Sequence, residues 1–526
     1  MFFSRKDRAA IARLQPDLKR RKILLGLTAA GVVGVVGLPD GATAQDADLL
    51  RVVANANPSS LDPATGGAGT DHVFLYNLYD TLVDWEPDTL AALPGLANSF
   101  DFTDPQTLVL RLQEGVTFHD GTPFDAEAVK VNLDRNRSSD VSNIRTDLAS
   151  IDSVDVTGPL EVTVRLNQPD TALPLILSDR AGMMVSPAAL EASEEGRVDR
   201  APVGTGPWKF VSWKDGESVI AEANDAYWKE GVPGTPRIEM RIIPDASTAL
   251  RAVQSGQADI AYGLSERQQT LIERTPNLGL VSGPTLFIYQ IYMNPAIGPL
   301  KDVRVRKALS HAIDRDAFVL ATQAGIGEPA YMNLPRAHWA YAPEAEQFTS
   351  YDPDLARELL AEAGYPDGLE LTMLSFPDQA TVQKQEFLLS QWEQIGVRGR
   401  FENGPIAESS IRFFAKGGGD LMLSAWTGRP DPSLTYSLLY SEKSFFNAGK
   451  LPPPDGFNQA MLESRSTQDE AERAKALAKA QMLVMEQALT IPLSVRYAVD
   501  ATSNSVENFN GNLLGKPKFQ EVTLSS

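Results

Sequence analysis

The residues best suited to bind a small molecule lie between positions 424 and 433, directly after an apolar run at 421–423. Small-molecule sites combine apolar or aromatic walls with a few fixed polar groups. The guanidinium of Arg429 can hold a carboxylate by two parallel hydrogen bonds, so it is a candidate contact for an anionic solute. Two alternatives stay open: Arg429 pairs with Asp431 at the loop surface, or Trp426 packs in the core. The candidate residues of this stretch are Trp426, Thr427, Gly428, Arg429 and Asp431.

Patterns that would indicate an enzyme are absent from the sequence. No Gly-x-Ser-x-Gly or His-Glu-x-x-His occurs, so a secreted hydrolase is the least favoured function. The stretch GTGPW at 204–208 lacks the Lys-Ser/Thr ending of a phosphate loop and the third glycine of a dinucleotide fingerprint. His119, in FHDGTP at 118–123, is typical of a tight turn rather than of catalysis. With four histidines and no cysteine, we expect no catalytic residue, no cofactor and no metal site.

The N-terminus has the composition of an export signal. Four basic residues at 19–22 precede a mostly apolar stretch at 23–38, and Ala-Thr-Ala at 42–44 suits a signal peptidase. We therefore predict a cleaved segment at 1–44, and Arg20-Arg21 resembles a twin-arginine signal, although Lys19 stands where that signal usually has Ser or Thr. The chain has no cysteine, and so no site for a lipid anchor on that residue. These features predict a periplasmic protein that is exported, soluble and not lipidated.

Charge and length further limit the partners and the architecture that we expect of the protein. The formal net charge is -20, and without residues 1–44 the chain keeps 40 Lys+Arg and 65 Asp+Glu, a charge of -25. A surface this acidic repels nucleic acid and anionic lipid, and we therefore expect neither as a partner. About 480 mature residues exceed what one hydrophobic core normally supports, so we expect two or more lobes in a monomer.

Hydrophobic periodicity predicts mixed α and β structure. Strands are expected where apolar residues alternate or run together, and helices where they recur at three- and four-residue spacing. Because strands and helices alternate, we predict α/β lobes with mostly parallel sheets. The expected strands are 49–56, 108–112, 162–166, 237–243 and 369–375, and the expected helices are 71–84, 124–135, 247–255, 303–312, 353–363, 381–395 and 469–487.

Eight sequence blocks occur in order along nearly the whole mature chain. They are LDP (61–63), LPGLA (93–97), LRLQEGVTFHDGTPF (110–124), GTGPW (204–208), NDAYW (224–228), QSG (254–256), DVRVRKALSHAIDR (302–315) and LLAEAG (359–364). Together they resemble the extracellular solute-binding family of the ABC importers for dipeptides, oligopeptides and nickel. One such block would be weak support, but their order makes the resemblance specific.

The resemblance implies a large, three-subdomain periplasmic binding protein fold with a ligand cleft between two lobes. The first lobe would comprise 45–88, 204–287 and 496–526, with an inserted subdomain at 89–203, and the second lobe would comprise 288–495. Hinge segments would lie near 284–290 and 490–500. The lobes would close on a peptide or peptide-like solute and deliver it to an ABC permease in the inner membrane.

The same resemblance places the solute contacts. In the peptide-binding relatives a Trp-x-x-Asp stretch sets an aspartate against the α-ammonium group of the ligand, whereas this chain has Arg429 there. A guanidinium repels a cation, so either Asp431 takes the role or Arg429 holds an anion, which we prefer. Thr70 and Asp71 would contribute from the first lobe. A metal chelate, an opine-like solute or a sugar conjugate on the same fold is the alternative cargo.

Overall fold

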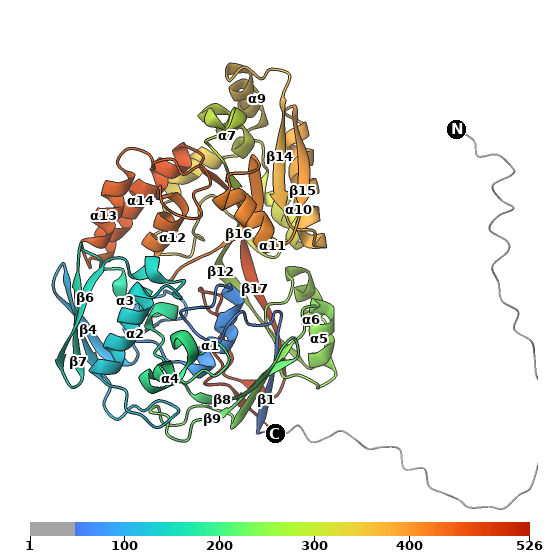
Figure 1. Ribbon diagram of the computed structural model, residues 1–526. Helices are drawn as coiled ribbons and strands as arrows, with labels where there is room; N and C mark the ends of the chain where they lie inside the picture. The colour runs from blue at the N-terminus through green and yellow to red at the C-terminus, as the bar shows by residue number, and fades with distance from the viewer. Residues whose placement is uncertain (1–47, 526) are drawn as a thin grey trace, which may run out of the picture. The chain divides into compact units, whose positions relative to one another are not determined.

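The computed structural model describes residues 48–525, so the predicted export signal lies outside the described residues. Its largest sheet has 11 strands in the order β15-β14-β16-β12-β17-β11-β1-β10-β9-β8, with β13 added on β17 (Figure 1). These strands are β1 (Leu49–Ala54), β8 (Trp208–Lys214), β9 (Ser218–Ala223), β10 (Arg237–Ile242), β11 (Ile260–Ala261), β12 (Leu278–Met293), β13 (Glu328–Pro329), β14 (Leu369–Ser375), β15 (Val397–Asn403), β16 (Leu421–Thr427) and β17 (Thr490–Ser503).

Two long strands, β12 and β17, stand at the middle of this sheet. They pair antiparallel from Leu278 opposite Ser503 to Tyr292 opposite Thr490, with an irregular register between Pro284 and Ile288. In the strand order they separate β14–β16 on one side from β1 and β8–β11 on the other. The expected hinge segments at 284–290 and 490–500 lie within these strands.

A second sheet has four strands in the order β4-β5-β7-β6, and all of its pairs are antiparallel. In the described part of the large sheet only the pairings β1-β10, β1-β11, β14-β15 and β14-β16 are parallel, and the others are antiparallel. The expectation of mostly parallel sheets is therefore wrong. Only two residues connect β4 to β5 and β6 to β7, which is too short for a parallel crossover. The remaining strands are β2 (Val83–Trp85), β3 (Ala92–Pro94), β4 (Ala97–Asp104), β5 (Thr107–Leu112), β6 (Ile151–Gly158), β7 (Glu161–Leu166), β18 (Val506–Glu507) and β19 (Thr523–Leu524).

The helices largely follow the predicted ranges. Helix α2 begins at its N-cap Asp125, whose carboxylate accepts a hydrogen bond from Ala128 N at 3.0 Å. The first helix is shorter than expected because Tyr79 is extended and the chain continues into β2. The helices are α1 (His72–Leu78), α2 (Ala126–Ser138), α3 (Leu173–Ile176), α4 (Pro187–Ala192), α5 (Ala246–Gln254), α6 (Gln269–Glu273), α7 (Val303–His311), α8 (Arg315–Gln323), α9 (Pro353–Glu362), α10 (Gln379–Glu393), α11 (Ile406–Ser410), α12 (Pro432–Tyr440), α13 (Phe457–Arg465) and α14 (Glu470–Glu486).

The turn at 118–123 has the structural role expected of it. Gly121 adopts φ +83°, which favours glycine, and His119 Nε2 lies 2.9 Å from the carbonyl oxygen of Gly206. Burial lowers the pKa of His119 to about 4, so the ring is neutral at physiological pH. A Cβ on Gly204 would lie 2.1 Å from Leu78 O, so the chain needs glycine where it returns beside α1.

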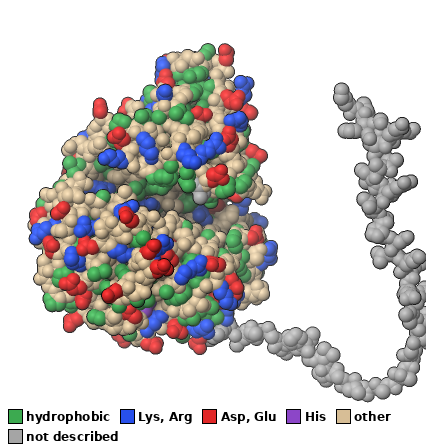
Figure 2. All heavy atoms as spheres, in the orientation of Figure 1, with side chains coloured by type: hydrophobic (Ala, Val, Ile, Leu, Met, Phe, Trp, Pro, Cys, Tyr) green, Lys and Arg blue, Asp and Glu red, His purple; other side chains and the backbone are tan. Residues whose placement is uncertain are grey.

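The predicted subdomains contain distinct sets of elements. Range 89–203 holds the four-stranded sheet with α2–α4, and range 288–495 holds β14–β16 with α7–α14. The boundaries themselves stay a prediction. Among residues 48–525, no helix has the length and apolar character that a membrane crossing requires. Figure 2 shows acidic and basic side chains interspersed over the face drawn there.

Candidate functional site

The candidate stretch begins at the end of β16, which pairs antiparallel with the central strand β12. Trp426 lies opposite Ile288 in this pairing, and its side chain is only 2% exposed. Its Nε1 donates to Thr435 Oγ1 at 3.2 Å, and its ring meets Phe446 edge-to-face with centroids 5.2 Å apart. Trp426 is therefore part of the hydrophobic core, the alternative that the sequence left open, and it supports the loop from behind.

Gly428 allows the chain to pass close to the central strand β12. Its backbone N–H donates to Leu286 O at 3.0 Å. A Cβ at this position would lie 2.3 Å from Leu286 Cβ, a distance that carbon atoms do not tolerate. The glycine therefore fixes the path that presents Thr427 and Arg429.

The side chain of Arg429 is half-buried, two residues beyond the end of β16. Its Nη1 donates to Thr427 O at 2.9 Å, and its Cζ lies 5.3 Å from the centroid of the Trp426 ring. No carboxylate of residues 48–525 forms an ion pair with Arg429 within 4.0 Å. Arg429 therefore does not pair with Asp431, the alternative that the sequence had left open.

Asp431 pairs instead with Arg473 of helix α14. The two side chains lie 2.5 Å apart and are 0% and 10% exposed. Asp431 also caps α12 by accepting from Ser433 N at 2.9 Å. Burial opposes ionisation, but Arg473 and Ser433 outweigh it and lower the pKa of Asp431 below its usual value. With its carboxylate fully buried and paired, Asp431 holds the loop in place and is not available to a solute.

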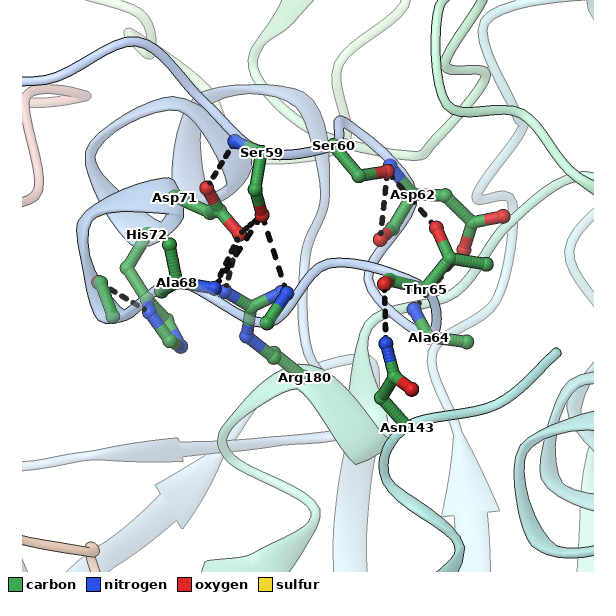
Figure 3. Close-up of polar contacts among 12 residues, drawn as sticks. Ser59, Ser60, Asp62, Ala64, Thr65, Ala68, Asp71, His72, Asn143 and Arg180 are labelled. Carbon is green, nitrogen blue, oxygen red and sulfur yellow. Dashed lines mark hydrogen bonds and ion pairs between the residues drawn. The ribbon is translucent and has the colours of Figure 1, made fainter. Parts of the chain in front are cut away.

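Asp71 likewise builds its loop rather than facing outward. Its carboxylate is fully buried and accepts from Ser59 N and Ser59 Oγ, both at 2.7 Å. Arg180 Nη2 donates to the same carboxylate at 2.9 Å and also to the carbonyl oxygen of Ala68. Figure 3 shows Arg180 and Ser59 converging on Asp71 across this loop. Thr70, the neighbouring candidate, is half-buried.

The loop and the end of β16 face each other. A Cβ on Gly69 would lie 3.9 Å from Thr427 Cγ2, an ordinary van der Waals contact. The structure therefore brings Thr427 close to the loop that carries Thr70 and Asp71. That these residues line a ligand cleft stays a prediction.

A buried ionic cluster that the sequence did not reveal adjoins this loop. Lys516 Nζ donates to Asp179 Oδ2 at 2.5 Å and lies 3.1 Å from His72 Nε2. Burial lowers the pKa of Lys516 to about 8, against the opposing effect of Asp179. Burial and Lys516 also lower the pKa of His72 to about 4. Because His72 and Lys516 are 444 residues apart, no local sequence pattern could have joined them.

Asp147 is a further residue whose position the sequence did not reveal. It lies in the short 3-10 helix Arg145–Leu148 and is half-buried. Burial raises the pKa of Asp147, and Arg429 is the cation that opposes this shift most. Within residues 48–525, no cation forms an ion pair with the Asp147 carboxylate within 4.0 Å.

Contacts between the predicted inserted subdomain and the predicted second lobe border the site. Asp170 Oδ2 lies 3.6 Å from Arg465 Nη1, and the two side chains are 1% and 13% exposed. Thr171 N donates to Arg465 O at 2.9 Å, and Thr171 Oγ1 donates to Thr467 O at 2.7 Å. Leu434 of α12 packs in the hydrophobic core formed mainly by residues 64–184.

The model of the family "bacterial extracellular solute-binding proteins, family 5 middle" matches residues 91–447. The chain belongs to this family. The family predicted from the sequence blocks is thereby confirmed, and its members are solute-binding proteins rather than enzymes.

Relatives of this solute-binding family match nearly the full chain. The glutathione-binding protein GsiB of Salmonella paratyphi A is 32% identical, and the match covers 92% of this chain and 95% of that protein. The periplasmic binding protein DppA from Helicobacter pylori, in complex with the peptide STSA, has a TM-score of 0.81 at 23% identity, covering 91% of this chain and 98% of that one. AgaA from A. tumefaciens, in complex with agropinic acid, has a TM-score of 0.81 at 22% identity, covering 91% and 99%. The chain thus has the predicted two-lobe α/β binding-protein fold.

Proposed function

We propose that this protein captures a small anionic, peptide-like solute between its two lobes and delivers it to an ABC permease in the inner membrane. Membership of the family supports solute capture, and the 32% identity to a glutathione-binding protein over 92% of the chain supports a short acidic peptide. The observation that carries the proposal is Arg429, a half-buried guanidinium without a carboxylate partner among residues 48–525. It stands where Thr427 faces the first-lobe loop.

The chemistry of Arg429 favours an anion over a cation. A guanidinium donates several hydrogen bonds and accepts none, so it binds carboxylate well and repels ammonium. Trp426 behind it and the hydrogen bond to Thr427 O hold the guanidinium in one orientation. Such preorganisation reduces the entropy lost when the solute binds.

Glutathione is the probe we choose to test this proposal. Titration calorimetry should detect binding to the wild-type protein, and Arg429→Gln should weaken it about 10- to 100-fold, the effect of one charge-assisted hydrogen bond. Arg398→Gln is the matched control, because Arg398 is exposed on β15. Equal binding by wild type and Arg429→Gln would contradict a role for Arg429.

The alternative cargo is a metal chelate, an opine-like solute or a sugar conjugate. Arg429 could hold the anionic group of any of these. Mass spectrometry of solute released from protein that was purified without refolding distinguishes them by mass.

Export and assembly are parts of the same proposal. The basic and apolar segments at 19–38 and Ala-Thr-Ala at 42–44 support cleavage near Gln45 and release into the periplasm without a lipid anchor. N-terminal sequencing of the periplasmic protein tests this, since an uncut N-terminus would contradict it. Light scattering tests the expected monomer.

A further inference from the structure

Charged side chains of both signs converge near the loop at 66–72. Among residues 48–525, this group contains the cations Arg180, Lys516 and Arg429 and the carboxylates Asp71, Asp179 and Asp147. Two of the carboxylates are already matched, since Arg180 Nη2 lies 2.9 Å from Asp71 and Lys516 Nζ lies 2.5 Å from Asp179. One cation and one carboxylate remain, Arg429 and Asp147.

Arg429 and Asp147 interact electrostatically without forming an ion pair. Among the cations, Arg429 does most to lower the pKa of Asp147, against the raising effect of burial, yet no ion pair within 4.0 Å joins these two residues. The segment before Asp147 touches the chain directly before this loop, because Asn143 N donates to Ala64 O at 2.8 Å and Asn143 Nδ2 donates to Thr65 O at 2.5 Å (Figure 3). Thr427 in turn contacts the position of Gly69. The segments that carry the two charges therefore both contact the stretch between Ala64 and Gly69.

We propose that Arg429 and Asp147 together bind one amino-acid head group, with the guanidinium on its carboxylate and the aspartate on its ammonium. This inference rests on the proposed function and specifies the class of solute. The solute would carry a free ammonium and a free carboxylate on the same carbon, as a γ-glutamyl peptide does.

The chemistry of ordinary peptides explains why this class is distinct. The N-terminus of an α-linked peptide carries an ammonium whose neighbouring carbonyl is an amide, so it offers the guanidinium no carboxylate on that carbon. A γ-linked glutamyl residue offers both charges together. Each half-buried protein charge then receives an opposite charge, which offsets the cost of removing both from water.

The arrangement also accounts for the replacement of aspartate by arginine at position 429. The resemblance implies an ammonium-binding aspartate there. In this chain a carboxylate for the ammonium is available from Asp147, on a different segment. The guanidinium at 429 can then take the neighbouring carboxylate without losing recognition of the ammonium.

Two isomeric tripeptides test the inference. Glutathione is γ-Glu-Cys-Gly, and its α-linked isomer has the same atoms and charge but separates the ammonium from the free glutamyl carboxylate. Calorimetry with a reductant is straightforward because the protein has no cysteine. We expect wild type to prefer glutathione by about 10- to 100-fold, the value of one charge-assisted hydrogen bond.

A variant and a deamino analogue isolate the role of Asp147. Asp147→Asn should weaken glutathione binding about 10- to 100-fold but leave the affinity for deamino-glutathione, which lacks the ammonium, unchanged. Asp140→Asn is the matched control: its side chain is fully exposed on the same segment and pairs with Arg145. It should bind both probes as wild type does, and unchanged melting curves would show that both variants fold.

The outcomes separate this inference from the proposed function. If wild type binds both tripeptides equally and Asp147→Asn loses no affinity for glutathione, the head-group inference is wrong while peptide capture stands. An equal loss for glutathione and its deamino analogue would also overturn it, because Asp147 would then not act through the ammonium. If neither tripeptide binds and no peptide-like solute is released from the purified protein, both ideas fail.

Discussion

Replacing Arg473 by methionine should destabilise the protein while leaving Arg429 and Asp147 in place. Methionine keeps most of the length of the arginine stem but removes the charge that faces Asp431. The Asp431 carboxylate would remain fully buried with Ser433 N as its hydrogen-bond donor. Arg473 also donates from Nε to Ser464 O at 2.9 Å, and that bond would be lost.

The size of the effect follows from this burial. Leaving one partner of a buried ion pair uncompensated costs about 3–5 kcal/mol. For a unit of about 480 residues unfolding together, the entropy of unfolding converts this to a fall in Tm of about 3–5 °C. Lys479→Met on the same helix is the matched control, because Lys479 and Glu463 are 3.8 Å apart and 52% and 45% exposed. Its cost should be at most about 1 kcal/mol.

The pH dependence provides a second readout of the same variant. In wild type the lowered pKa of Asp431 stabilises the fold at neutral pH, and this contribution is lost as the pH falls through the folded pKa. Without Arg473, burial dominates and raises the pKa of Asp431. The deficit of Arg473→Met should therefore be largest at neutral pH and shrink as the pH falls. Scanning calorimetry measures both proteins, and a deficit no larger than that of Lys479→Met would refute the structural role of this pair.

Three further predictions concern the loop, the central strands and the contact beside the site. Gly428→Ala should lower the free energy of chemical unfolding by about 1–3 kcal/mol, because its Cβ would overlap Leu286. In the control Gly67→Ala the added Cβ has nothing within 4 Å, so the free energy of unfolding should change by less than about 0.5 kcal/mol. Equal effects of the two substitutions would contradict the packing argument. Burial raises the pKa of Asp500 from 3.8 to about 7, so the folded protein keeps a proton that the unfolded chain has lost between these two values, and stability should fall as the pH rises from about 4 to about 7 and then level off. Asp500→Asn should lessen this fall in Tm between about pH 4 and 7, and an unchanged profile would exclude Asp500 as its source. Arg465→Gln removes the contact with Asp170. If this contact favours closure of the lobes, the variant should have a larger radius of gyration than wild type in small-angle scattering without solute. An unchanged radius together with unchanged solute affinity would show that the contact does not favour closure.

Local features of the fold could be predicted because local physics determines them. Apolar alternation identified β5 and β7, and the N-cap Asp125 located the start of α2. The direction of strand pairing could not be read in this way. β12 and β17 pair over most of their length although about 200 residues separate them, and nothing in either strand indicates its partner.

For the candidate site too, local features could be predicted and long-range partners could not. The chemistry of Arg429 as an anion contact followed from its type and position. The partners of the carboxylates did not, since Asp431 and Arg473 are 42 residues apart and Asp71 and Arg180 are 109 apart. A carboxylate that binds solute and one that holds a loop are chemically identical in sequence. Only tertiary packing distinguishes Asp147, which lacks an ion pair among residues 48–525, from the paired Asp71 and Asp431.

Native mass spectrometry of the protein taken directly from the periplasm tests the central claim most directly. The account predicts a non-covalent complex with a small acidic, peptide-like solute, which is released unchanged when the protein is denatured and is lost from Arg429→Gln but retained by Arg398→Gln. Chemical conversion of the solute by the purified protein, or equal retention by both variants, would contradict it.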